Sequence, residues 1–160
     1  MSEHSERLLR VLDENLSKIK AISPERASSK PNLLKWSRKE LLGHLIDSAA
    51  NNHQRFVRIQ NQEELIFQGY DQDQWVVVQH YQGMEWKDII SLWFRYNQHL
   101  AQVIQKIPES VLTKTRTEHN LHQIAFKTIP KSESTTLEYF IEDYIDHLEY
   151  HLDQIFNYRY

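Results

Sequence analysis

Four stretches of the sequence repeat apolar residues at intervals of three and four, and this pattern limits what the chain can fold into. Such spacing places the apolar side chains on one face of a helix. Only three glycines and four prolines occur among 160 residues, so few positions interrupt the pattern. The predicted helices cover residues 3–22, 38 to about 60, 86–107, and 136 to about 157. The sequence therefore predicts an all-α fold, a four-helix bundle with two long connections, in one domain over residues 1–160.

Two of the predicted helices begin with a capping sequence. Ser37 is followed three residues later by Glu40, and Thr135 is followed in the same way by Glu138. In a capping box, each of the two side chains accepts a hydrogen bond from the backbone amide of the other residue. We therefore expect one helix to begin directly after Ser37 and another directly after Thr135.

The two long connections have different patterns. Residues 61–85 show no helical period, and a connection of this length in a small domain is usually functional or locally structured. Residues 111–129 begin with alternating threonines, which predicts a small hairpin or an ordered loop.

The composition excludes several classes of protein. A net charge of −3 and an isoelectric point near 6.3 give no basic surface for nucleic acid. The N-terminal residues contain no apolar run of signal-peptide length, and no stretch is long enough to span a membrane. The sequence lacks cysteine, which removes disulfides, thiolate metal ligands and a cysteine nucleophile. We expect a cytoplasmic protein that acts on a small molecule.

Two histidines lie four residues apart near the end of the last predicted helix. His147 and His151 therefore occupy one face, one turn apart, and two neutral imidazoles so placed can bind one metal ion. In the second predicted helix, His44 lies on one flank of the apolar stripe. His147 and His151 lie on the flank of the stripe of the last helix, and the rotational side is the same in both helices. If the two helices are antiparallel neighbours, the flanks face a shared cleft. His44 is therefore the predicted third ligand.

Four polar residues complete the set of candidate site residues. Asp47, one turn from His44, is the predicted catalytic residue, and it could orient an imidazole, act as a base or bind the metal. Asn51 and Arg55 follow on the same stripe and could bind an anionic group of a substrate. Asn97, near the centre of an apolar face, is either a buried structural amide or a donor that lines a pocket. The alternatives are that Asp47 is a solvated residue or a structural partner of Arg55, and that Arg55 forms a surface ion pair.

These motifs together resemble a known family. Residues 36–48 (WSRKELLGHLIDS), residues 70–76 (YDQDQWV) and the pair His147 and His151 occur in the order seen in the DinB-like superfamily, which includes YfiT-like metal-dependent hydrolases. The resemblance implies a four-helix bundle in which His44, His147 and His151 hold a divalent metal. It also implies a homodimer, and family members include thiol-dependent transferases that use bacillithiol or mycothiol.

A site of three histidines has two predicted chemistries. A metal held by three imidazoles keeps an open position, where a bound water becomes acidic or a bound thiol loses its proton. The first case predicts a hydrolase and the second a thiol S-transferase, whose low-molecular-weight thiol must come from outside the chain. Imidazole suits zinc, nickel, copper and iron alike, and we expect a divalent zinc, nickel or iron. The alternatives are a non-catalytic metal- or ligand-binding bundle, and a structural bundle whose histidines lie in the core.

Overall fold

Four long amphipathic helices form the framework of the protein, as the apolar spacing predicts. The computed structural model describes residues 2–159. The four helices begin and end within two residues of the predicted positions, except that residues 59–61 continue the second helix as a 3-10 turn. They are α1 (Glu3–Lys20), α3 (Arg38–Arg58), α5 (Trp86–Lys106) and α8 (Leu137–Phe156).

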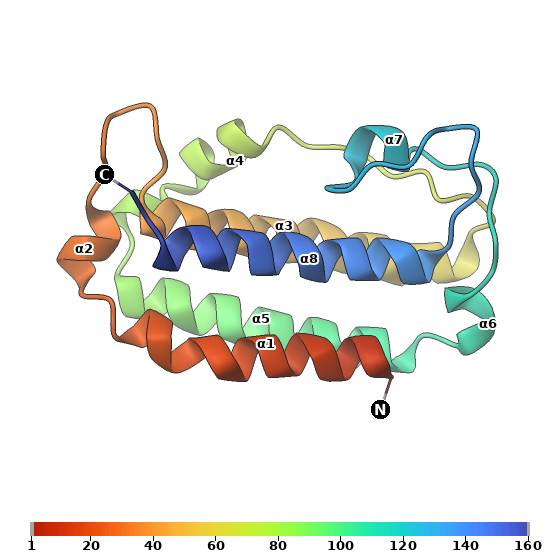
Figure 1. Cartoon of the computed structure of the whole chain (residues 1–160), viewed down its shortest axis with the longest axis horizontal. Helices are drawn as coiled ribbons and strands as arrows, with labels where there is room; N and C mark the ends of the chain where they lie inside the picture. The colour runs from red at the N-terminus through yellow and green to blue at the C-terminus, as the bar shows by residue number, and fades with distance from the viewer. Residues whose placement is uncertain (1, 160) are drawn as a thin grey trace.

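The helices are arranged as two pairs (Figure 1). Helix α1 packs against α5 and α8, and α3 packs against the same two helices, so α3 and α8 are neighbours. Helices α3 and α8 run in opposite directions, whereas α3 and α5 run in the same direction. Because parallel neighbours begin at the same end of the bundle, the chain must return along its length between α3 and α5. This requirement accounts for the long connection over residues 59–85.

Short helices divide the connections. The first, between α1 and α3, contains α2 (Pro24–Ser28). Residues 59–85 contain η1 (Ile59–Asn61), α4 (Gln72–Gln79) and η2 (Tyr81–Gly83). Residues 107–136 contain α6 (Glu109–Leu112) and α7 (Leu121–Ile124). Helices α4 and α7 both lie over the side of the bundle that α3 and α8 form (Figure 1).

The hairpin that the threonine alternation suggested is absent between residues 111 and 129. This segment forms an ordered loop with two short helices, and its bridges join it to other parts of the chain, Leu65 to His119 and Arg116 to Thr135. His119 in this loop is buried, and its Nε2 contacts the Glu133 carbonyl at 2.7 Å. The bridges of this segment thus lead to distant residues, while Thr113, Thr115 and Thr117 are exposed.

The capping box of α3 is confirmed, whereas that of α8 is wrong by one residue. Ser37 Oγ accepts from the Glu40 amide at 3.2 Å, and Glu40 Oε2 accepts from the Ser37 amide at 2.7 Å. In α8 the N-cap is Thr136, because the backbone of Thr135 is engaged in two hydrogen bonds with Arg116. The Glu138 carboxylate consequently faces His4 instead of closing a capping box.

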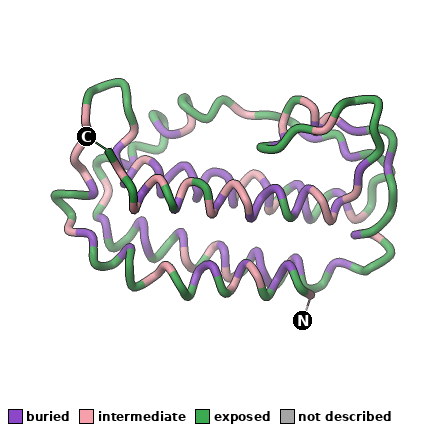
Figure 2. The backbone as a smooth tube through the Cα atoms, viewed as in Figure 1, coloured by how far each residue is buried: buried purple, intermediate pink, exposed green. Residues whose placement is uncertain are grey.

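The core lies between the four helices, where the buried residues gather (Figure 2). Trp86 and Trp93 on α5 belong to this core. Asn15 bonds its amide to the Val11 carbonyl at 2.7 Å, as expected for a polar residue at the edge of the apolar stripe. None of the helices within residues 2–159 combines the length and the apolar character that crossing a bilayer requires.

Candidate metal centre

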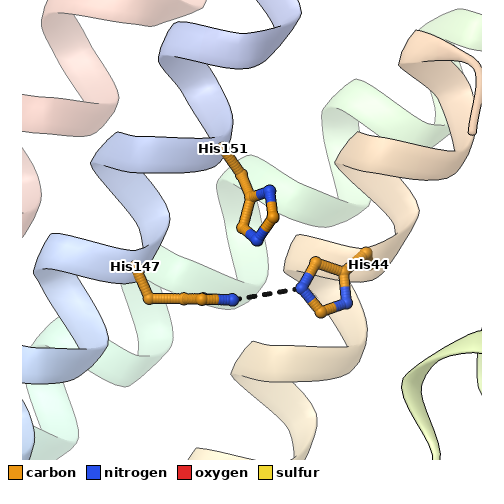
Figure 3. A group of neighbouring side chains, drawn as sticks. All are labelled: His44, His147 and His151. Atoms are coloured by element: carbon orange, nitrogen blue, oxygen red, sulfur yellow. Dashed lines mark hydrogen bonds between the residues drawn. The ribbon is translucent and has the colours of Figure 1, made fainter. Parts of the chain in front are cut away.

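Three histidines from two helices meet between α3 and α8 (Figure 3). His44 extends from α3, and His147 and His151 extend from α8 toward it. The Nε2 atoms of His44 and His147 are 3.1 Å apart. One nitrogen of each of the three rings lies within 4.8 Å of one nitrogen of each of the others. The predicted convergence of these side chains is therefore present in the fold.

The antiparallel packing of α3 on α8 produces this convergence. On α8, the two histidines lie beside the buried residues Tyr144, Leu148 and Leu152. On α3, His44 precedes the buried Leu45 and is itself fully buried. Since both apolar stripes must face the core, the flanking imidazoles are turned toward each other at the seam between the helices.

Burial keeps the three rings neutral at neutral pH. Burial, followed by the positive charge that His151 would carry, lowers the pKa of His44 to about 3. Burial and the charges of the other two rings lower the pKa of His147 to about 2. Burial also lowers the pKa of His151, although its hydrogen bond to Gln154 acts in the opposite direction. Neutral imidazole is the form that binds metal ions, because it keeps a nitrogen lone pair.

The hydrogen bond to Gln154 also selects a tautomer of His151. Nδ1 of His151 lies 2.7 Å from the Gln154 side-chain oxygen, which can only accept. The proton is therefore assigned to Nδ1, and Nε2 keeps its lone pair for a metal. Residues three apart on a helix are neighbours, so the contact between His151 and Gln154 could have been predicted from the sequence.

The geometry fits a metal ion. Two nitrogens that bind one tetrahedral zinc ion at ~2.0–2.1 Å are ~3.3 Å apart. The separation of 3.1 Å between His44 and His147 is close to this value. His44 Nδ1 is buried and has no hydrogen-bond partner among the described residues. The same separation also suits a hydrogen bond between two neutral rings, so metal content is the measurement that distinguishes the two.

The histidines border a cavity of about 430 Å³. His147 and His151 line it, together with the buried guanidinium of Arg55 on α3. Aromatic side chains form much of the remaining wall, among them Tyr70, Phe126, Phe140, Tyr144 and Tyr150. A cavity of this size, with a few polar groups in an aromatic wall, is typical of a site for a small molecule.

A loop from the second long connection covers the cavity beside His147. The Phe126 ring lies 5.4 Å from the His147 ring and 5.2 Å from the Tyr150 ring, between centroids. Asp143 on α8 holds this loop, because its carboxylate accepts hydrogen bonds from the backbone amides of Phe126 and Lys127 at 2.8 and 2.6 Å. Asp143 is therefore a structural residue of the site that the sequence analysis did not identify. Its pairing with a loop sixteen residues away left no pattern in the sequence.

Asp47 lies one turn after His44, but its visible contacts are to the first long connection. Its Oδ1 accepts hydrogen bonds from the Tyr81 hydroxyl at 2.6 Å and from Gln79 Nε2 at 3.1 Å. Burial raises the pKa of the Asp47 carboxyl, and these two hydrogen bonds oppose that rise. Asp47 does not line the cavity beside the histidines. Its catalytic role stays a prediction, while its contacts hold residues 79–81 against α3.

Asn51 and Arg55 occupy different positions relative to the histidines. Asn51 donates its amide to the Asp47 carbonyl at 2.9 Å and lines a second cavity, also of about 430 Å³. Arg55 lines both cavities. The structure thus brings Arg55, but not Asn51, into the cavity of the histidine cluster.

Asn97 is fully buried in α5, away from both cavities. Its side-chain oxygen accepts from the Tyr144 hydroxyl, and its amide donates to the Trp93 carbonyl at 2.9 Å. The assignment of Asn97 to substrate binding stays a prediction without support from the geometry. The hydrogen bonds instead fit the structural alternative, in which Asn97 is a buried amide that joins α5 to Tyr144 of α8.

Comparisons with known proteins agree with this architecture. The sequence matches the DinB superfamily over residues 7–155, and no curated protein matches it. Among solved structures, the fold is similar to YfiT from Bacillus subtilis, described as a probable metal-dependent hydrolase with an unusual four-helix bundle topology. The TM-score is 0.73 at 16% sequence identity, over 98% of this chain and 87% of YfiT. Because the family match covers most of the sequence, this protein belongs to the DinB superfamily.

Proposed function

We propose that this protein is a metal-dependent enzyme that acts on a small molecule bound in the cavity beside α8. His44, His147 and His151 are the proposed ligands of a divalent zinc, nickel or iron ion. The observation that carries the proposal is the convergence of three neutral imidazoles, that of His44 buried and those of His147 and His151 half-buried, the latter two of which line a cavity of about 430 Å³. The description of YfiT as a probable metal-dependent hydrolase supports the same class of activity.

Three residues around the histidines have distinct roles in this proposal. Gln154 keeps the proton of His151 on Nδ1 and so leaves Nε2 free. Trp36 packs against His44, with ring centroids 5.0 Å apart, and Phe126 covers His147. These two aromatic rings thus form part of the apolar surroundings of the imidazoles.

Two reactions are compatible with the proposed site. A divalent metal, when bound, supplies a Lewis acid that makes a coordinated water or thiol acidic at neutral pH. Hydrolysis uses the water, and thiol transfer uses a small-molecule thiol, since the chain contains no cysteine. Comparing turnover of an electrophilic substrate with glutathione, with bacillithiol and without thiol would distinguish transfer from hydrolysis. Asp47 as catalytic residue, the homodimer and the cytoplasmic location remain predictions from the sequence.

Metal content tests the proposal directly. We expect about one divalent ion per chain in protein purified without an affinity tag, and a loss of most of it in His147→Ala, because two imidazoles bind far more weakly than three. His99→Ala is the matched control, since His99 is exposed on α5 and should leave the metal content unchanged. Elemental analysis by mass spectrometry gives both values. Full metal content in His147→Ala would contradict the proposal.

A non-catalytic binding protein is the alternative function. It predicts the same metal content but no turnover with any thiol or hydrolase substrate in a broad panel. A purely structural bundle predicts no metal and a melting temperature that chelator leaves unchanged, because only a ligand of the native state stabilises that state.

A further inference from the structure

One buried cation in the cavity has no anionic partner among residues 2–159. Arg55 lies on α3, about three turns after His44, and only 9% of its surface is exposed. A guanidinium is charged under all ordinary conditions. Charged groups taken out of water are usually paired with a group of opposite charge, because desolvation is otherwise unfavourable.

The contacts of Arg55 within the protein are all to neutral groups. Nη2 donates to the Gln68 carbonyl at 2.8 Å, and Nη1 donates to Asn52 Oδ1 at 3.4 Å. No carboxylate of residues 2–159 lies within 4.0 Å of the guanidinium. Three aromatic rings lie 5.9 Å from its central carbon, those of Phe67, Tyr70 and Phe140. Two of its five N–H donors are therefore used, and its charge is not balanced.

The acidic residues that line the two cavities are already engaged. Asp143 lines the same cavity, but its two oxygens accept the backbone amides of Phe126 and Lys127. Asp71 lines the second cavity, where it is exposed and caps α4 by accepting from the Gln74 amide. Neither carboxylate forms an ion pair with Arg55.

Arg55 lies where the two cavities meet. Arg55, Gly69 and Tyr70 line both of them, and His147 and His151 line the first. A molecule in the first cavity can therefore contact the histidines with one part and the guanidinium with another. Burial lowers the pKa of Arg55, which agrees with a cation held without a compensating charge.

We propose that Arg55 binds an oxyanion of the substrate, a carboxylate or a phosphate, while the reacting part of the same molecule lies beside His147 and His151. The proposal rests on the proposed function, since it names the class of substrate for that cavity. The planar fork of the guanidinium matches two oxygens of either group, and the uncompensated charge accounts for a preference over neutral analogues. An enzyme of this kind selects acids over the corresponding amides and alcohols.

The test uses the full chain after metal removal, so that an added anion cannot bind to the metal instead. Succinate, inorganic phosphate and the neutral succinamide are titrated separately while the Arg55 side-chain resonance is followed by NMR. We expect saturable shifts with succinate, with phosphate or with both, and none with succinamide. Shifts with only one of the two anions would identify that group as the ligand. Equal shifts with succinamide, or no saturable shift with either anion, would overturn the proposal.

Variants give the second part of the test, read from backbone amides around the cavity. Arg55→Gln should weaken anion binding roughly tenfold or more, as expected for loss of charge-assisted hydrogen bonds. Arg55→Lys keeps the charge without the fork and should bind with intermediate affinity. Arg10→Gln removes the same charge from the exposed face of α1 and should bind as the unmodified protein does. Unchanged affinity in a folded Arg55→Gln protein would overturn the proposal. Metal binding is measured separately with His147→Ala, so either proposal can fail alone.

Discussion

Gly43 directly precedes His44, and its α-carbon lies against the ring of Tyr81. A β-carbon at this position would be 2.2 Å from Tyr81 Cδ2, far inside van der Waals contact. Tyr81 is buried, and its hydroxyl donates to Asp47 on the same face of α3. The absence of a side chain at Gly43 therefore lets residues 79–81 approach the helix beside the histidine cluster.

Gly43→Ala should destabilise the protein. Alanine improves helix propensity by about 1 kcal/mol, but displacing a buried ring typically costs about 1–3 kcal/mol, and a contact this short requires a large displacement. We expect a net loss of roughly 1–2 kcal/mol in the free energy of unfolding, measured with urea. Gly83→Ala is the control, since nothing lies within 4 Å of its β-carbon and it should be neutral or slightly stabilising. An unchanged midpoint for Gly43→Ala would show that Tyr81 moves freely.

At the scale of elements, helix α8 contributes to the site in two ways. It carries two of the three histidines, and through Asp143 it fixes the loop that places Phe126 over His147. Burial raises the pKa of Asp143, and the two backbone amides oppose that rise. The wall of the cavity next to the histidines thus depends on one carboxylate of α8.

Asp143→Asn should release this loop. An amide has one acceptor oxygen instead of two, so one backbone N–H would face an NH₂ group and lose its partner, at a cost of about 1–3 kcal/mol. We expect faster amide hydrogen exchange at Phe126 and Lys127 and a lower stability. Asp153→Asn, on the exposed part of α8, should change stability by less than ~0.5 kcal/mol. Unchanged exchange at both amides would show that other contacts fix the loop.

At the scale of the whole molecule, buried tyrosines connect the helices. Tyr144 on α8 donates to Asn97 on α5, and Tyr81 donates to Asp47 on α3. Burial raises the pKa of Tyr144 and of Tyr81, and burial raises the pKa of Tyr70 to about 12. The folded state therefore disfavours the ionised form of several tyrosines at once.

Alkaline pH should unfold the protein for this reason. Because the folded pKa lies above the unfolded value of 10, the stabilisation is complete below pH 10 and is lost as pH rises toward about 12. Each such tyrosine contributes a decrease of up to about 1.4 kcal/mol per pH unit in that range. Urea midpoints measured across the range should fall, and they should fall less steeply for Tyr144→Phe. A urea midpoint that does not change with pH above 10 would contradict the raised pKa values of these tyrosines.

Most of the fold could be predicted because its signals are local. Apolar spacing set the four helices, and the Ser37–Glu40 capping box set the start of α3. The start of α8 was misplaced by one residue because Thr135 pairs with Arg116, a partner outside the helix. For residues 111–129 the ordered loop formed and its alternative, the hairpin, did not, since the bridges of this segment lead to distant residues.

The sequence by itself determined the helices and the flanks on which His44, His147 and His151 lie, because a helix fixes the direction of each side chain relative to the apolar stripe. Only the tertiary structure decided that α3 and α8 are antiparallel neighbours, that Asn97 is enclosed by Tyr144, and that Arg55 reaches the cavity whereas Asn51 does not. Those outcomes depend on packing between segments far apart in the chain. Such packing depends on the shapes of the contacting surfaces and on burial, and the spacing of residues within one segment does not determine either.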